Sequence, residues 1–482
     1  MNCCNTITPL SILKIKEKPM KMSVKRTKRY ESPHESNDTT IKSDSIEEMH
    51  TALFQLNIDC FEAIFEYLSL KDLHSFGQTC KAMQQMAGGY FHRNFKSAEK
   101  FSANDAIYMV YSNNDGVSNE RIQTSSFNQF INYISHYYEE MEPLHYIHSH
   151  SDEFTAINRI YLVCLAINPT KIGYLQKILS KINVVQLRQC TLIGDFYETL
   201  LSHCKQLKRL YVQDDLGDII DESGNPWLLR QYPTLELFQL TLRYPFRILE
   251  LSTFFERNPN VRSFSTSSRC LWENRHELLK CKAELDRLEI EMLDNFYRQL
   301  IDMQLICELL NQLYERGFYQ RLHLFVKRVD QKCSEQLASV YGLECLSIRQ
   351  FSRSYSLPLL TNLKVLTILN GSNTNDMDIL AKNLVNIERI CFQNATHSDI
   401  LPFIRRSVRL NKVKFVPTAN EAILKLAKLN VERVKLAGAR KITIYVPDNV
   451  FLATKWTAKN GEINLNMIEM KRADSYEWDQ HY

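Results

Sequence analysis

One short hydrophobic pattern recurs through most of this chain and limits the folds that it can adopt. An apolar residue is followed by two others, a second apolar residue, one other and a third apolar residue. The twelve copies begin at Ile157, Ile182, Leu207, Leu235, Val261, Leu285, Tyr319, Leu343, Leu363, Ile387, Leu410 and Val431, and the copy at Val261 has Thr266 in place of the third apolar residue. Successive copies start 20 to 28 residues apart, except for one gap of 34 residues after Leu285. One such match is common in a chain that is 44% apolar, but twelve in near-regular order predict a repeat architecture.

The spacing of the copies resembles that of leucine-rich repeats, whose period is about 20 to 29 residues. Helical-looking stretches separate the copies, for instance at residues 196–204 and 376–384, so each unit is expected to be a strand followed by a helix. Cys190 and Asn394 follow two of the copies, at the place where such repeats use Cys or Asn. These features predict an α/β repeat fold, a leucine-rich-repeat solenoid or horseshoe over residues 157–456.

The regions beside the repeats are expected to complete the solenoid. Residues 97–156 contain aromatic, helix-like pieces such as 127–133, which predict a helical linker and a cap over the first repeat. Residues 457–482 are expected to form a C-terminal cap or tail. An ordinary α/β domain with alternating strands and helices is the alternative. It has less support because such nucleotide-binding folds usually carry a glycine-rich phosphate loop, and neither GxGxxG nor GxxxxGK occurs in this sequence.

The first 50 residues differ in composition from the rest. They hold few aromatic residues, and the basic run Lys25–Arg29 is followed by a polar, acidic stretch, so we expect disorder. The basic run is a candidate nuclear import signal. The longest apolar run is far shorter than the roughly 20 residues that span a bilayer, and the 13 cysteines include no CxxC pair. We therefore expect no membrane partner, no disulfide framework, and a cytoplasmic or nuclear location.

A helical module is predicted over residues 54–96. Its apolar residues recur at helical spacing, with a short break in the middle: Phe61, Ile64, Phe65, Leu68, then Leu70, Leu73, Phe76, Cys80 and Met83. Two or three short amphipathic helices fit this pattern. Asp59 is expected to cap the first helix, and Asp72 is expected near the start of the next, where exposed backbone amides favour a carboxylate.

The segment from Leu56 to Lys81 resembles the F-box. The resemblance rests on the opening Leu56, the Ile64-Phe65-x-x-Leu68 helix, the Lys71-Asp72-Leu73 turn and the Thr79-Cys80-Lys81 segment. The family usually has proline where this chain has Asn57. The resemblance implies that this short all-α module docks to a Skp-type adaptor, which bridges to a cullin and a RING subunit. The implied adaptor-binding residues are Leu56, Ile58, Ile64, Phe65, Leu68, Leu73 and Cys80.

The concave side of the solenoid is the expected substrate site. Side chains alternate along a strand, so the residues between the framework positions should face the concave surface. The candidates are Arg209, Tyr211, Arg321, His323, Arg349, Arg389, Lys412, Lys414, Arg433 and Lys435. Their basic character in the carboxy-terminal half fits an acidic or phosphorylated segment of a protein substrate, because arginine pairs bidentately with carboxylate and phosphate oxygens. A solvated face of mixed charge is an equal alternative, and nucleic-acid binding is a lesser one, given a net charge of only +4.

Signatures of catalysis are missing from the sequence. No GxSxG, HExxH or kinase-type motif occurs. His145, His148 and His150, with nearby His136, lack the spacing that brings three ligands to one helix face. We therefore predict a non-catalytic protein with no metal and no cofactor, the substrate-recognition subunit of a Skp-cullin-F-box ubiquitin ligase. The alternatives are a non-ligase leucine-rich-repeat scaffold and, with less support, an enzyme built on an α/β fold.

Overall fold

The computed structural model divides the chain into two units, Met1–Leu56 and Asn57–Tyr482. It describes residues 56–95, 99–103, 106–112, 119–123, 125–137, 142–163, 166–167, 169–192, 196–214, 226–242, 247–292, 302–329, 331–350, 360–369, 374–418, 423–457 and 465–473. The disorder and the import signal predicted for residues 1–50 lie outside the described residues.

Three helices open the second unit, as predicted from the helical spacing of its apolar residues. They are α2 (Ile58–Phe65), α3 (Leu70–Gly77) and α4 (Lys81–Asn94). A small antiparallel sheet and a short 3-10 helix follow: β1 (Glu99–Ala103), β2 (Ala106–Ser112), β3 (Asn119–Gln123) and η1 (Ser125–Phe130). The helical linker predicted for residues 97–156 is thus wrong in part, because aromatic and β-branched residues also suit strands and no helical period runs through β1 to β3.

In the part of the chain that the structure describes, one sheet of 14 strands forms the main body, and every neighbouring pair that is hydrogen-bonded in it is parallel. Its strands, in spatial order, are β4 (Tyr133–Tyr137), β5 (Arg159–Val163), β7 (Val184–Arg188), β9 (Arg209–Asp214), β10 (Leu237–Leu242), β11 (Ser263–Ser267), β12 (Leu285–Met292), β13 (Tyr319–Arg328), β14 (Leu343–Gln350), β15 (Val365–Ile368), β16 (Arg389–Ala395), β17 (Lys412–Pro417), β18 (Ile442–Val446) and β19 (Ile468–Arg472). Two further short strands, β6 (Ala166–Ile167) and β8 (Thr191–Leu192), form a separate parallel pair. Because spatial order follows chain order, the strands stack as a solenoid.

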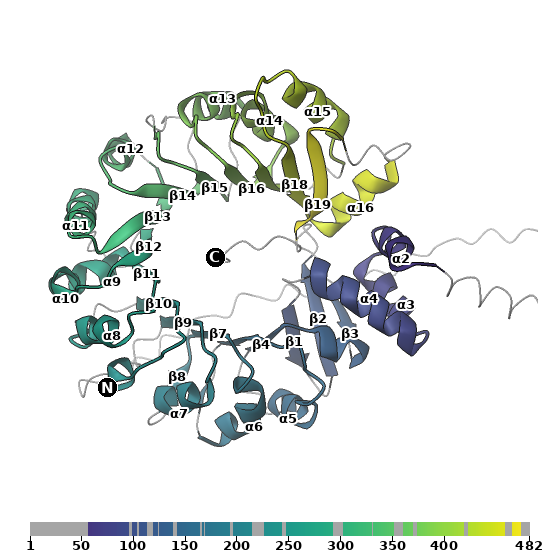
Figure 1. Cartoon of the computed structure of the whole chain (residues 1–482), viewed down its shortest axis with the longest axis horizontal. Coiled ribbons are helices and arrows are strands. Elements are labelled where there is room, and N and C mark those ends of the chain that lie inside the picture. Colours follow the sequence, from purple (N-terminus) through teal and green to yellow (C-terminus); the bar gives the residue numbers. More distant parts are fainter. Residues whose placement is uncertain are drawn as a thin grey trace, which may run out of the picture. The chain divides into compact units, whose positions relative to one another are not determined.

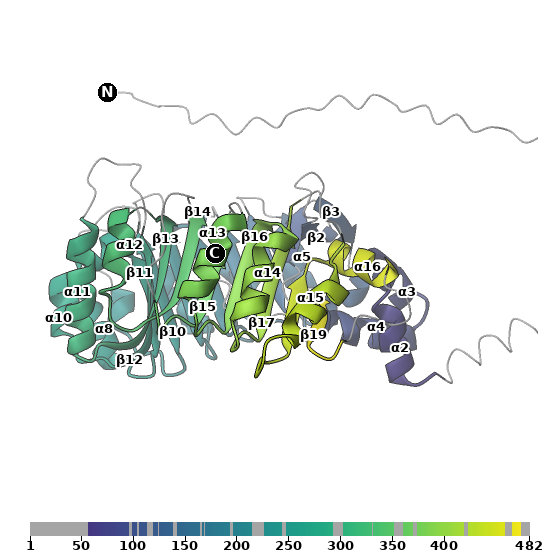
Figure 2. The same cartoon turned by 90° about the horizontal axis from the view of Figure 1, so that it is seen from above.

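Helices connect most of these strands. Figure 1 shows that the strands form the inner layer of the curved solenoid and the helices its outer layer, and Figure 2 shows the same arrangement from above. The helices are α5 (Glu142–Ser149), α6 (Pro169–Leu179), α7 (Phe196–His203), η2 (Pro226–Leu229), α8 (Leu251–Arg257), α9 (Ser268–Glu273), α10 (Arg275–Lys280), α11 (Met303–Glu315), α12 (Gln331–Leu337), α13 (Thr374–Asn383), α14 (His397–Arg406), α15 (Leu426–Val434) and α16 (Asp448–Thr457). The predicted strand-helix repeat solenoid after a short helical module is therefore confirmed.

The repeats are held in register by backbone bonds that recur from unit to unit. The amide of Asn183 donates to the carbonyl of Asn158 at 2.8 Å, just before β7 begins. The amide of Lys208 donates in the same way to Asn183, and that of Glu236 to Lys208, each at 2.8 Å. Corresponding residues of successive repeats thus stack one above the other, which explains why the apolar pattern returns at a near-constant interval.

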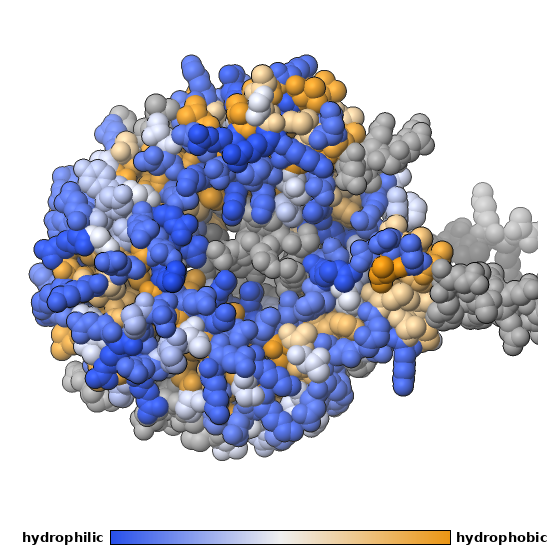
Figure 3. All heavy atoms as spheres, in the orientation of Figure 1, coloured by the Kyte–Doolittle hydropathy of each residue, from blue (hydrophilic) through white to orange (hydrophobic). Residues whose placement is uncertain are grey.

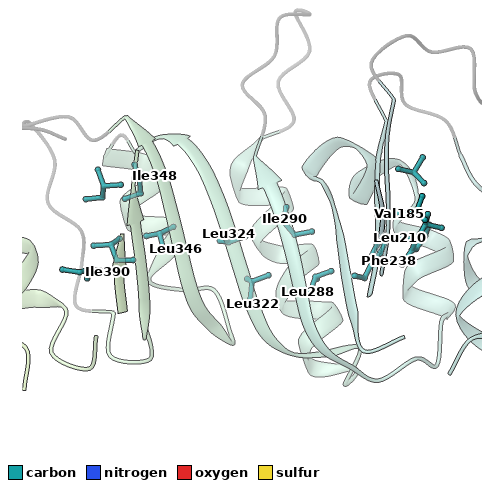
Figure 4. Packing of buried hydrophobic residues seen from close by; sticks show 14 of the residues in the cluster. Val185, Leu210, Phe238, Leu288, Ile290, Leu322, Leu324, Leu346, Ile348 and Ile390 are labelled. Carbon is teal, nitrogen blue, oxygen red and sulfur yellow. The ribbon is translucent and has the colours of Figure 1, made fainter. Parts of the chain in front are cut away.

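The core lies between the sheet and the helices. Val185, Leu210, Phe238, Leu288 and Leu322 occupy corresponding positions on their strands and are no more than 1% exposed (Figure 4). Removing each such side chain from water contributes roughly 1.5–3 kcal/mol relative to leaving it exposed. Residues one position later on the same strands face the opposite, inner side of the sheet, as the alternation of a strand requires.

Eleven of the twelve predicted pattern copies coincide with strands of the main sheet, and the twelfth is wrong. The copy at Val431–Leu436 lies largely in helix α15, and the strand of that repeat is β18. Apolar residues three apart fit a helix as well as the repeat pattern, so six residues could not separate the two. Strands β4 and β19 were missed, which extends the sheet on both sides of the predicted limits 157 and 456.

Candidate functional site

The first helix of the module is fixed by its own N-cap. The side chain of Asn57 accepts a hydrogen bond from the amide of Cys60 at 2.9 Å, so Asn57, and not the predicted Asp59, caps α2. Asn is among the best N-cap residues, which gives a physical role to the residue that stands where the F-box family usually has proline. Ser69 caps α3 and accepts from the amide of Asp72 at 3.1 Å, with Asp72 in the first turn as predicted.

Helix α2 presents apolar side chains on two faces. Phe61 and Phe65 point into the module and pack with Phe76 and Tyr90, at ring-centroid distances of 5.4 Å for Phe65–Phe76 and 5.5 Å for Phe65–Tyr90. Cys60 and Ile64, each one position earlier, are exposed. The second face is therefore free of the module's core, and Figure 3 shows an apolar area over α2.

The seven residues predicted to bind an adaptor differ in their exposure and form three groups. Four are exposed: Leu56, Ile58, Ile64 and Cys80. Leu68 is half-buried, whereas Phe65 and Leu73 are completely buried in the core of the module. Phe65 and Leu73 thus hold the helices together in this structure, and the exposed residues are the ones that a partner can reach.

The module is tied to the far edge of the sheet through Arg472 of β19. Arg472 is 3% exposed, forms an ion pair with the buried Asp448, and donates to the hydroxyl of Tyr90. It also donates to the carbonyls of Glu66 and Leu68, at 3.2 and 3.0 Å, just after the end of α2. A cation at a helix C-terminus satisfies carbonyls that have no partner within the helix. The last strand therefore supports the first helix.

Helix α16 adds a second contact to the same module. Lys455 is buried, forms an ion pair with Glu66, and lies 4.4 Å from the centre of the Tyr67 ring. Trp456, the next residue, packs edge-on against Tyr67 with ring centroids 5.3 Å apart. Tyr67 and Trp456 were not predicted as site residues. No sequence signal links them, because only the tertiary fold brings them together.

The predicted substrate residues on strands lie on the inner side of the sheet. Arg321, Arg349 and Arg389 are exposed, Arg209, His323, Lys412 and Lys414 are half-buried, and Tyr211 is 7% exposed. Arg389 and Lys412 are Cα partners on β16 and β17, so their side chains are neighbours, and Lys414 lies two residues further along β17. Arg321 is partly compensated by Glu344, whose carboxylate is 4.0 Å away. A compact basic strip thus covers β16 and β17.

Arg433 and Lys435 do not belong to this strip. Arg433 lies in α15 and is 0% exposed, and its guanidinium donates to the carbonyls of Ile404, Ser407, Val408, Leu410 and Arg440. Lys435 follows the helix and pairs with Glu432 at 3.0 Å. Their prediction as concave-face residues is wrong because the pattern copy that carried them is a helix and not a strand.

A polar cluster occupies the middle of the inner face. His323 Nε2 lies 3.2 Å from Ser347 Oγ, and His323 Nδ1 lies 4.0 Å from a carboxylate oxygen of Glu289. The same three residue types act in hydrolases, where the serine must reach the substrate. Ser347 is 0% exposed and Glu289 pairs with Arg287 at 2.9 Å, so this cluster has the geometry of a structural network on the sheet.

The histidines near residue 148 make packing and backbone contacts. The ring of His145 packs on Tyr174 at 4.5 Å, His148 Nδ1 lies 3.3 Å from the carbonyl of Tyr174, and His150 Nδ1 lies 3.0 Å from that of Tyr146. Among the described residues, no group of three or more His, Cys, Asp and Glu side chains could hold a metal ion. None of the helices in the described part of the chain is both long and apolar enough to cross a membrane.

Comparison with known families identifies the helical module. The family description "F-box domain" matches residues 53–88, which include α2, α3 and the first half of α4. A search of curated proteins gave no match to the chain. The chain therefore carries an F-box domain, followed by a long region of parallel strands and helices that is consistent with repeats.

Proposed function

We propose that this chain is the substrate-recognition subunit of a Skp-cullin-F-box ubiquitin ligase. The F-box match on helices that keep an apolar face exposed is the observation that carries the proposal. F-box domains dock to Skp-type adaptors, and the adaptor joins the receptor to the cullin and RING subunits. In this arrangement the chain performs no chemistry itself. It raises the effective concentration of a bound substrate near the conjugating enzyme.

The exposed face of α2 has the character of a docking surface. Ile64 is 40% exposed on this face, whereas large aliphatic side chains of this kind are usually buried in a folded domain. Ile58, the first residue of the helix, is 50% exposed at its end. Cys60 lies four residues before Ile64 and thus on the same face of the helix. Burial of this face by a partner would remove apolar surface from water without disturbing Phe61 and Phe65.

A charge placed on this face tests the proposal. In the full chain, Ile64→Asp should abolish binding of a purified Skp-type adaptor, measured by calorimetric titration. Leu249→Asp is the matched control, because Leu249 is 61% exposed on the solenoid and its replacement introduces the same charge. Equal adaptor affinity of both variants and the wild type would contradict the proposed docking face. A wild-type chain with no affinity for adaptors would favour the repeat scaffold instead.

The repeats, which we assign to the leucine-rich class by their period, are proposed to bind the substrate on their inner face. The basic strip of Arg389, Lys412 and Lys414 supports an acidic or phosphorylated segment as the ligand, because guanidinium and ammonium groups pair strongly with carboxylate and phosphate. Lys471 on β19 continues the row of Lys414 across the sheet, because it is the Cα partner of Tyr445, which is the partner of Lys414. Glu469 pairs with Lys471 at 3.1 Å and limits the strip at its far end.

Charge reversal on the strip tests the substrate proposal. Replacing Arg389, Lys412 and Lys414 by glutamate should remove binding to a phosphopeptide library, while adaptor affinity is kept. The matched control reverses Lys382, Arg406 and Lys428 on outer helices, which are exposed and change the net charge equally. Equal loss in both triple variants would indicate a nonspecific charge effect and contradict the assignment of the strip.

A further inference from the structure

Two exposed aromatic residues meet at the end of the F-box helices. Tyr67, which follows α2, is 41% exposed, and Trp456, at the end of α16, is 68% exposed. Their rings pack edge-on at a centroid distance of 5.3 Å. An exposed tryptophan is unusual, because moving such a large apolar side chain out of water lowers the free energy. The contact with Tyr67 leaves most of the Trp456 surface available.

The position of Trp456 is fixed by the buried contacts of the preceding residue, Lys455. Lys455 has an 8% exposed side chain, although lysine is rarely buried unless it is paired. Its ammonium forms an ion pair with Glu66 and lies over the rings of Tyr67 and Phe451, 4.4 and 5.6 Å from their centres. The end of α16 is therefore held against the residues that end α2. The buried contacts of Lys455 thus hold Trp456 beside the F-box.

The apolar surface continues from α2 onto this aromatic pair. The amide of Tyr67, in the turn just after α2, donates to the carbonyl of Ile64 at 2.9 Å, so the two residues are neighbours where the helix ends. Ile64 is 40% exposed, and Trp456 adjoins Tyr67 on the other side. Ile64, Tyr67 and Trp456, called the composite patch below, are contributed by two segments that are remote in sequence.

We propose that the adaptor-binding surface of this protein extends beyond the F-box to Trp456, so that the Skp-type adaptor contacts the composite patch. The inference rests on the proposed function. The adaptor is the occupant because the patch is continuous with the exposed F-box face of α2. Buried tryptophan and tyrosine residues carry a large share of the binding energy at many protein interfaces. The end of the solenoid thereby becomes part of the ligase-assembly surface.

Truncation of Trp456 tests the inference in the full chain. Trp456→Ala should weaken adaptor binding about 30-fold or more, the usual effect of removing an aromatic hot spot. Trp456→Phe should retain part of the affinity, because it keeps a ring against Tyr67. Leu249→Ala is the matched control, an exposed apolar side chain remote from the F-box. A thermal melt of each variant separates loss of contact from loss of folding.

The outcomes distinguish this inference from the proposed function. Wild-type affinity of Trp456→Ala, together with loss of binding by Ile64→Asp, would overturn the composite patch and leave the receptor assignment standing. No adaptor binding by the wild type would overturn both. As a direct readout, hydroxyl-radical labelling of Trp456 should fall several-fold when the adaptor is bound. Unchanged labelling of Trp456 in the saturated complex would also overturn the inference.

Discussion

The guanidinium of Arg472, in the last strand of the sheet, donates a hydrogen bond to the hydroxyl of Tyr90, in the last F-box helix. The two residues are 382 positions apart in the chain. Helix α4 also contacts η1, just before the opposite edge strand, where Gln84 donates to the carbonyl of Ser126 at 2.5 Å. The F-box helices thus pack against segments next to both edges of the sheet. This arrangement makes the stability of the F-box depend on residues at the end of the chain.

Removal of the Arg472 guanidinium should destabilise the protein strongly. Arg472→Met leaves the buried carboxylate of Asp448 and the carbonyls of Glu66 and Leu68 without their cation, a change that typically costs about 3–5 kcal/mol. Urea unfolding followed by circular dichroism measures the difference. Arg405→Met is the control, because Arg405 pairs with Glu432 near the surface and its loss should cost at most about 1 kcal/mol. Equal unfolding midpoints of the two variants would refute the role given to Arg472.

Stability should fall at alkaline pH as Tyr90 ionises. Burial raises the pKa of Tyr90 to about 12, above its ordinary value of 10.0. The unfolded chain therefore releases the Tyr90 proton at a lower pH than the folded chain does. The contribution of Tyr90 to the free energy of unfolding is complete below pH 10 and is lost as pH rises from 10 toward about 12. At about 1.4 kcal/mol per pKa unit, the loss is roughly 3 kcal/mol. In Tyr90→Phe, which has no phenol, chemical unfolding should show a smaller loss over this range. If the free energy of unfolding fell equally with pH in the wild type and in Tyr90→Phe, the prediction would be contradicted.

The regular part of the fold was predictable because its cause is local. Strands β5 to β17 repeat an alternation of core and inner-face residues, and the stacking of equivalent residues such as Asn158, Asn183 and Lys208 preserves the interval. The two faces of α2 were not separable in this way. Phe65 and Ile64 are adjacent apolar residues, and nothing within the helix says which of them the module buries.

Contacts between remote segments could not be predicted. Arg472 stands in the short sequence Ile-Glu-Met-Lys-Arg and has the local features of a surface residue. It is buried only because Asp448, Tyr90 and the carbonyls after α2 converge on it. Arg433 was placed on the concave face because its pattern copy was assigned to a strand, whereas it lies in α15 and is buried against carbonyls of other segments.

Arg433 should act on stability and not on substrate binding. Its guanidinium donates to four backbone carbonyls between the end of α14 and the start of β17, and to the carbonyl of Arg440 just before β18. Arg433→Met should lower the free energy of unfolding by at least about 3 kcal/mol, since each buried carbonyl left without a donor costs about 1–3 kcal/mol. Lys435→Met, two residues later and 65% exposed, should change it by less than about 1 kcal/mol. An intact fold of Arg433→Met with reduced substrate affinity would instead restore the concave-face assignment.

A buried asparagine should stabilise the turn before β11. Asn258 is 2% exposed, accepts from the amide of Tyr232 at 2.5 Å, and donates to the carbonyls of Phe254 and Arg230 at 2.8 and 3.0 Å. Asn258→Ala removes the partner of the Tyr232 amide and of the Arg230 carbonyl, whereas the Phe254 carbonyl keeps the backbone amide of residue 258. The loss should cost roughly 3 kcal/mol, read from the shift in urea midpoint. Asn260, two residues later and exposed, bonds to one carbonyl at 2.7 Å, so Asn260→Ala should cost about 1 kcal/mol or less. If the two alanine variants unfolded at the same urea concentration, the bonds between neighbouring repeats made by Asn258 would contribute no more than a surface contact.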